Sequence, residues 1–274
     1  MEHIGGVRTL ETMKSEPLII GHRGSSAHAP ENTLAAFQMA IDAGADGIEF
    51  DVRLAADSVP VVIHDANLRR TGNRLEIVAD KTAKQLGKID VGSWFNSKFP
   101  TNSSPTFARQ TIPTLAQTLK LFESFDGWFY IELKATDRDF CALATAVCDE
   151  IRDSPLLSRI IVKSFKLAAI AEVRHQLPDV ETAALFSPKI MDFLRRRRHI
   201  LAIAHEFGAT QISLHKSLIT PALMKRANLA GIPVTVWTVD NIKWTNRCRR
   251  LGIGALITND PGAFTARRGK TALD

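Results

Sequence analysis

From Leu18 onward, eight short apolar runs alternate with stretches of helical periodicity, and this alternation strongly limits the folds open to the chain. Apolar runs rich in β-branched residues and followed by helical repeats are typical of parallel strand-helix units. Eight units predict a single (β/α)8 TIM barrel, a fold for which 274 residues is an ordinary length. We expect strands at 18–21, 47–52, 128–133, 159–164, 181–186, 210–214, 233–239 and 254–258, and helices at 32–43, 114–125, 139–152, 167–176, 193–207, 221–230 and 243–251.

The expected domain plan is a tail of residues 1–16 followed by one barrel domain, 17–274. The run 59–64 follows the second strand too closely for a crossover helix, so it is an antiparallel return or an extension of that unit. Residues from about 65 to 113 then form an insertion at the rim where such barrels keep their active sites. It either walls one side of a pocket or packs around its own aromatic residues, Trp94, Phe95, Phe99 and Phe107, and the two are compatible.

Composition gives weaker indications. The formal charge of +6 and pI near 9.4 could attract phosphates, nucleic acid or anionic lipid, but surface bias also explains them. The run Arg195 to Arg198 is interpreted as a solvated helix face, so we expect no nucleic-acid partner. No apolar run approaches a membrane span, and the first fifteen residues lack the apolar core of a signal peptide. These features predict a cytoplasmic protein without membrane insertion.

Ionisable residues gather where the first three strands end. Glu49 and Asp51 alternate on one face of the second strand, and burying two like charges is costly unless a cation neutralises them. Neighbouring strand ends meet at one rim of a barrel, so other ionisable residues should join this pair. They are His22 and Arg23 after the first strand, His64 after the return, and Glu132 and Lys134 at the end of the third strand.

Each of these residue types has a task if the substrate is a phosphodiester. Three carboxylates suit one hard divalent cation, Mg²⁺ or Ca²⁺. Arg23 and Lys134 can neutralise phosphate charge. His22 and His64 can act as general acid and general base, although the sequence does not say which is which.

Several motifs resemble the signature of glycerophosphodiester phosphodiesterases of the bacterial cytoplasmic type. The most specific lie in the first part of the chain, and the resemblance extends from about Ile19 to Pro261. The motifs are His22-Arg23-Gly24, Ala29 to Thr33, Gly44 to Val52, Pro60 to Asp65, Leu68 to Thr71, Ile112 to Leu115, Ile131 to Lys134, Val236 to Val239 and Thr258 to Pro261.

The resemblance implies a TIM barrel with a small insertion after its second strand. It also implies metal-dependent hydrolysis of glycerophosphodiesters to glycerol 3-phosphate and an alcohol. By position, Glu49, Asp51 and Glu132 match the metal ligands, and His22 and His64 match the acid/base pair. Arg23 and Lys134 match phosphate-binding residues, and Trp237 matches an aromatic residue that lines the pocket. Glu31 and Asn32 belong to a motif and are expected to hold the start of the first helix, with Asn32 or Thr33 near its cap.

Two segments depart from the family pattern. The fourth strand ends Lys163-Ser164-Phe165-Lys166, and the sixth carries Leu214-His215-Lys216. We expect neither to contact the metal set, although both could change the alcohol side of the pocket.

Three alternatives remain open at this point. The substrate could be a lipid, as for lysophospholipase D or sphingomyelinase D, with Trp94, Phe95 and Phe99 facing the membrane. A non-catalytic phosphate-binding barrel is a candidate of another class. If the protein is a hydrolase, the residues fit two mechanisms equally well. Water could attack the phosphorus directly, or a glycerol hydroxyl could attack it first and form a cyclic phosphate.

Overall fold

The computed structural model describes residues 16–189 and 199–268. It contains a closed barrel of eight parallel strands, because the last strand pairs with the first and the first also pairs with the second. The prediction of a (β/α)8 barrel is therefore confirmed. In order around the barrel the strands are β1 (Leu18–His22), β2 (Gly47–Leu54), β4 (Trp128–Leu133), β5 (Ile160–Ser164), β6 (Glu181–Phe186), β7 (Gln211–His215), β8 (Val234–Trp237) and β9 (Ala255–Thr258).

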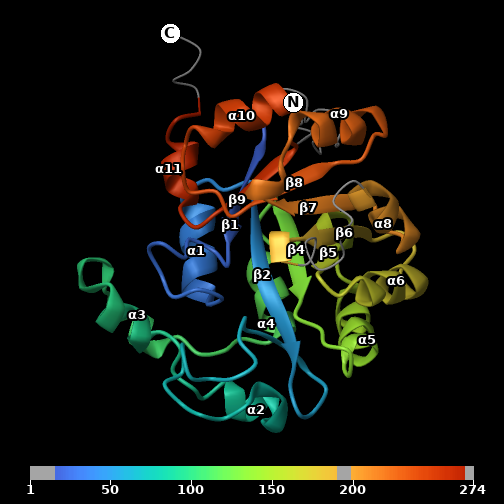
Figure 1. Ribbon diagram of the computed structural model, residues 1–274. Coiled ribbons are helices and arrows are strands. Elements are labelled where there is room, and N and C mark those ends of the chain that lie inside the picture. The colour runs from blue at the N-terminus through green and yellow to red at the C-terminus, as the bar shows by residue number, and fades with distance from the viewer. Residues whose placement is uncertain (1–15, 190–198, 269–274) are drawn as a thin grey trace, which may run out of the picture.

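Helices surround this barrel (Figure 1). Several begin at a threonine whose hydroxyl accepts a hydrogen bond from a backbone N–H of the first turn, as at Thr33, Thr114 and Thr220. The helices are α1 (Leu34–Asp42), α4 (Leu115–Phe122), α5 (Phe140–Ile151), α6 (Leu167–Gln176), α8 (Ile200–Glu206), α9 (Pro221–Leu229), α10 (Trp244–Leu251) and α11 (Pro261–Thr265). The predicted helix 193–207 is described only from residue 199 onward, and the short helix α11 was not predicted.

Apolar side chains fill both sides of the strands. One buried cluster lies inside the barrel and includes Ile20, Tyr130, Ile161 and Ile257. Two larger clusters lie between the strands and the surrounding helices. An apolar interior of this kind leaves the strand ends as the place for charged side chains.

The segment after β2 returns as β3 (Pro60–Val62), which pairs antiparallel with β2 through Val52 and Val62. The antiparallel return predicted for 59–64 is therefore confirmed. The following segment carries α2 (Ala83–Leu86) and α3 (Ser93–Lys98), and Figure 1 shows it beyond the arrowhead of β2, with α3 on the same side as α1. Short 3-10 turns lie at Val78–Asp80, Pro100–Asn102, Phe107–Arg109, Leu157–Arg159 and Lys216–Leu218.

The aromatic residues of this segment pack on one another and also on the first strand-helix unit. Phe95 and Phe107 are buried against Ala29 and Ala36, which belong to the first strand-helix unit. Their rings meet edge to face with centroids 5.7 Å apart. The segment is thereby fixed to the barrel rim beside the first strand end.

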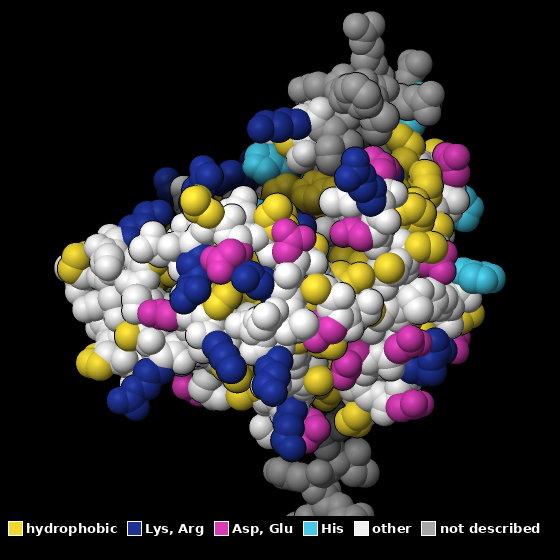
Figure 2. All heavy atoms as spheres, turned by 90° about the horizontal axis from the view of Figure 1, so that it is seen from below, with side chains coloured by type: hydrophobic (Ala, Val, Ile, Leu, Met, Phe, Trp, Pro, Cys, Tyr) yellow, Lys and Arg dark blue, Asp and Glu magenta, His cyan; other side chains and the backbone are white. Residues whose placement is uncertain are grey.

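Over the described residues, no helix is long and apolar enough to cross a membrane. On the face seen in Figure 2, lysine and arginine side chains lie among aspartate and glutamate side chains. The arginine run 195–198 falls outside the described residues.

Candidate active site

Three carboxylates meet at the ends of two neighbouring strands. Asp51 of β2 pairs in register with Glu132 of β4, and Glu49 lies two residues earlier on the same face of β2. All three are buried, and one carboxylate oxygen from each lies within 4.8 Å of the others. The structure therefore brings the predicted metal ligands together, in a spacing that could hold one ion.

Two cations contact this triad at the positions expected from the sequence. Arg23 Nε lies 3.0 Å from Asp51 Oδ2, and Lys134 Nζ lies 3.2 Å from Asp51 Oδ1 and 2.6 Å from Glu132 Oε1. Burial alone would raise the pKa of Asp51, but the charges of Arg23 and Lys134 outweigh burial and hold that pKa well below its ordinary range. Asp51 is therefore a carboxylate at neutral pH.

A third cation lies in the same cluster and was missed. Lys163 of β5 is in register with Glu132, and its side chain is 2% exposed. Its Nζ lies 2.7 Å from Glu49 Oε1 and 3.9 Å from Glu132 Oε2. The expectation that the Lys163 segment does not contact the metal set was wrong, because Lys163 lies one strand beyond Glu132 and its long side chain reaches across the strand end.

Of the two residues expected near the cap of α1, Thr33 is the cap, and the side chain of Asn32 instead contacts Asp51. Its side-chain amide donates to Asp51 Oδ2 over 2.9 Å, and its Oδ1 accepts from the Asp51 backbone N–H over 3.2 Å. Asn32 has φ of 57°, a left-handed conformation that asparagine tolerates better than most residues. That conformation turns its amide toward β2.

His22 is held by a chain of hydrogen bonds from the last strand. Its Nδ1 lies 2.6 Å from Asn259 Oδ1, while Asn259 Nδ2 donates to Asp240 Oδ2 over 2.9 Å. Since a carboxylate only accepts, this second bond fixes the orientation of the Asn259 amide and makes Nδ1 of His22 the donor. Nε2 of the neutral ring then carries the lone pair. Burial lowers the pKa of His22, which favours that neutral form.

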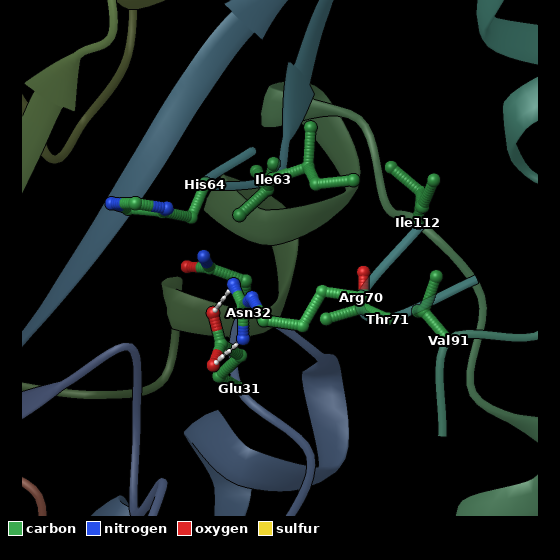
Figure 3. Close-up of a pocket in the computed structure, with 9 residues that line it drawn as sticks. Glu31, Asn32, Ile63, His64, Arg70, Thr71, Val91 and Ile112 are labelled. Atoms are coloured by element: carbon green, nitrogen blue, oxygen red, sulfur yellow. Dashed lines mark hydrogen bonds and ion pairs between the residues drawn. The ribbon is translucent and has the colours of Figure 1, made fainter. Parts of the chain in front are cut away.

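His64 has a different partner. Its Nδ1 lies 2.6 Å from Asp65 Oδ1, and the other Asp65 oxygen accepts from Arg70 Nε over 2.7 Å. Arg70 also donates to both oxygens of Glu31, which in turn accepts from Arg23 over 2.7 Å. Figure 3 shows Arg70 extending toward Glu31, with Asn32 and His64 beside the pair. The insertion therefore supplies part of the site, and residues of this network line a small pocket.

Trp237 ends β8 on the far side of the barrel opening. Its ring lies edge to face with Phe165, at a centroid distance of 5.5 Å, and with His215, at 5.2 Å. Phe165 follows β5 and His215 ends β7, so the surroundings of Trp237 come from three strand ends.

The sequence as a whole matches known proteins. Residues 22–263 match the model of the glycerophosphoryl diester phosphodiesterase family. A glycerophosphodiester phosphodiesterase of Bacillus altitudinis is 33% identical over 244 residues, covering 89% of this chain and 94% of that one. A glycerophosphodiester phosphodiesterase of Caldanaerobacter subterraneus is 32% identical over 248 residues, covering 89% of this chain and 94% of that one.

Solved structures agree on the fold. The crystal structure of a glycerophosphodiester phosphodiesterase from Agrobacterium tumefaciens superposes with a TM-score of 0.72 at 26% identity, covering 91% of this chain and 99% of that one. The structure of an Oleispira antarctica phosphodiesterase in complex with sn-glycerol-3-phosphate superposes with a TM-score of 0.79 at 23% identity. The match covers 92% of this chain and 96% of that one.

Proposed function

Because the chain belongs to the glycerophosphoryl diester phosphodiesterase family, we propose that Glu49, Asp51 and Glu132 hold one divalent cation at the phosphate of a glycerophosphodiester. The reaction of the family is hydrolysis of such diesters to glycerol 3-phosphate and an alcohol. The observation that carries the proposal is the meeting of three buried carboxylates with two histidines and three cations at one barrel rim.

The donor set fits a hard cation. All three groups are carboxylates, the ligands that Mg²⁺ and Ca²⁺ prefer, and their oxygens lie close enough to share one ion. A bound cation would withdraw charge from a phosphoryl oxygen and keep further positions for water or substrate. Asn32 holds Asp51 in place through two hydrogen bonds, as residues behind metal ligands commonly do.

Arg23 and Lys134 supply positive charge for the phosphodiester. Both lie within 3.2 Å of Asp51 and keep more than a tenth of their side-chain surface exposed. Arg23 offers a planar fork and Lys134 a mobile ammonium, and both can stabilise charge that develops on the phosphoryl oxygens.

The hydrogen-bond partners of the histidines favour distinct roles. His22 has its Nδ1 proton directed at Asn259, and its Nε2 lone pair lies on the side of Glu49, whose Oε2 is 3.9 Å away, so it suits a general base beside the carboxylates. The Asp65 carboxylate contacts Nδ1 of His64 and orients the ring, so we assign to His64 the remaining role, the general acid that protonates the leaving alcohol. Trp237 would line the alcohol side of the pocket.

Release of glycerol 3-phosphate tests the reaction. The water-soluble substrates are glycerophosphocholine, glycerophosphoethanolamine and glycerophosphoglycerol. The lipid is lysophosphatidylcholine, for which the readout is choline release, because its other product is lysophosphatidic acid and not glycerol 3-phosphate. We expect turnover of at least one water-soluble diester, and its loss in a Glu132→Gln variant but not in the exposed control Glu150→Gln. Turnover confined to the lipid would favour the lysophospholipase D alternative, and no turnover of any diester would refute the proposal.

Two finer parts of the proposal have separate tests. Phosphorus NMR during turnover detects a cyclic phosphate if a glycerol hydroxyl attacks first, and shows none if water attacks directly. A cytoplasmic location is also part of the proposal, and cell fractionation tests it.

A further inference from the structure

The Lys163 ammonium contacts two of the three carboxylates that could hold a metal ion. It approaches Glu49 to 2.7 Å and Glu132 to 3.9 Å, and lies among side chains with almost no exposure to water. Each of the two carboxylates is also one of the three that could hold an ion. Lys163 and a metal ion would therefore both interact with Glu49 and Glu132.

The charges of the cluster balance without a metal ion. Glu49, Asp51 and Glu132 carry three negative charges, and Arg23, Lys134 and Lys163, which contact them, carry three positive charges. Arg23 also contacts Glu31, but Glu31 has a cation of its own in Arg70. A divalent cation added to this set leaves two charges in excess in a buried environment, where uncompensated charge is costly. Without Lys163, the same set would carry one net negative charge and attract the ion.

We propose that Lys163 is a built-in counter-ion that competes with the divalent cation for Glu49 and Glu132. This inference rests on the proposed metal site. The lysine side chain is a flexible stem with a compact charge, so its ammonium can leave Glu49 when the ion enters. The consequence is weak cation binding and a carboxylate cluster that stays compensated when no ion is bound.

Calorimetric titration of the chelator-treated full chain with Mg²⁺, and separately with Ca²⁺, tests the competition. We expect the Kd of Lys163→Gln to be at least about tenfold lower than that of the wild type. The control Lys120→Gln removes a charge from the exposed face of α4 and should leave the Kd unchanged.

Equal Kd values for the wild type and Lys163→Gln would overturn the inference and leave the proposed function intact. If neither the wild type nor any variant binds the ion, both the competition by Lys163 and the proposed metal site are wrong. A thermal scan gives a second readout: metal-free Lys163→Gln should melt below the wild type, and saturating metal should raise its Tm by more. An equal rise in both proteins would also count against competition.

A measurement on the wild type alone covers the case in which Lys163→Gln fails to fold. In a crystal soaked with Mn²⁺, the ion should lie among the three carboxylates and Lys163 Nζ should no longer contact Glu49. An ion at the triad with the contact between Lys163 and Glu49 retained would refute the proposal, as would an absence of Mn²⁺ from the triad.

Discussion

Asn32 and Asp51 exchange two hydrogen bonds, one from the Asn32 amide to Asp51 Oδ2 at 2.9 Å and one from the Asp51 backbone N–H to Asn32 Oδ1 at 3.2 Å. Both residues are buried. The pair fixes the carboxylate of the second strand against the loop that precedes the first helix. A side chain outside the expected set therefore determines where a candidate metal ligand points.

Replacing Asn32 should have two separable effects, one on metal binding and one on the stability of the fold. Asn32→Gly keeps the left-handed backbone but removes the amide, so we expect metal affinity to fall about 10–100-fold. Asn32→Ala should bind metal as weakly as Asn32→Gly. It should also be less stable than Asn32→Gly by roughly 1 kcal/mol, because a φ of 57° disfavours alanine, which has a Cβ, relative to glycine. Calorimetry and denaturant unfolding measure the two effects, and an Asn32→Gly variant with wild-type affinity would contradict the account.

Loss of either histidine should affect catalysis rather than folding. His22→Ala and His64→Ala are expected to lower kcat by about 10²–10⁴, the usual effect of removing a general acid or base. His205→Ala, on the exposed side of α8, is the control and should keep full activity. Turnover above a tenth of the wild-type rate in either site variant would rule out that histidine.

The assignment of His22 as the base predicts a pH profile. Burial lowers the pKa of His22 from its ordinary 6.5, so the acid limb of kcat/KM should have its midpoint below that value. A base is active when it has lost its proton, and activity should therefore fall as the pH drops through this midpoint. A limb centred above pH 6.5 would show that another group controls the reaction.

The network of Glu31 predicts acid sensitivity. Burial alone would raise the pKa of Glu31, but its bonds to Arg70 and Arg23 outweigh burial and lower it. A carboxylate whose pKa is lowered by folding stabilises the protein above its unfolded pKa, and this contribution is lost as the pH falls through the folded value. The loss should therefore begin near pH 4 and continue below it.

Thermal scans between pH 7 and 3 measure this contribution. Glu31→Gln should melt about 2–6 °C below the wild type at pH 7, and the two Tm values should converge in acid. Glu150→Gln, exposed on α5, should follow the wild type throughout. A difference between Glu31→Gln and wild type that stays constant with pH would contradict the assignment.

Gly24 should not tolerate a side chain. It has φ of 86°, and a Cβ there would lie 2.5 Å from the Ala36 carbonyl in the first helix. Gly24→Ala is expected to cost about 3 kcal/mol or more. Gly44→Ala is the control, since Gly44 has a similar φ of 75° but its nearest neighbour would be 4.0 Å away, and should cost about 1–2 kcal/mol. Denaturant unfolding measures both losses. An equal loss in the free energy of unfolding in the two variants would show that the contact with Ala36 is unimportant.

The sequence was sufficient for the barrel and for most of the strand-end cluster. Strands such as β4 and β6 have apolar runs with clear boundaries, and period-two spacing within a strand places Glu49 beside Asp51 and Glu132 beside Lys134. These are local patterns. The meeting of strand ends at one rim then follows from the fold itself.

Lys163 and Asn32 could not be placed in this way. Lys163 reaches the cluster through the register between β4 and β5, which the sequence of one strand does not contain. Asn32 reaches it through a left-handed turn before α1, although an asparagine between a motif glutamate and a helix-capping threonine was a possible signal. The five-residue helix α11 is too short for periodicity to reveal.

The most direct test of the metal site is recovery of activity by chelator-treated protein as Mg²⁺ or Ca²⁺ is added back, with glycerol 3-phosphate release as the readout. The account predicts almost no release without metal, and saturable recovery with one ion bound per chain. Full turnover in protein shown by elemental analysis to be free of divalent metal would contradict it.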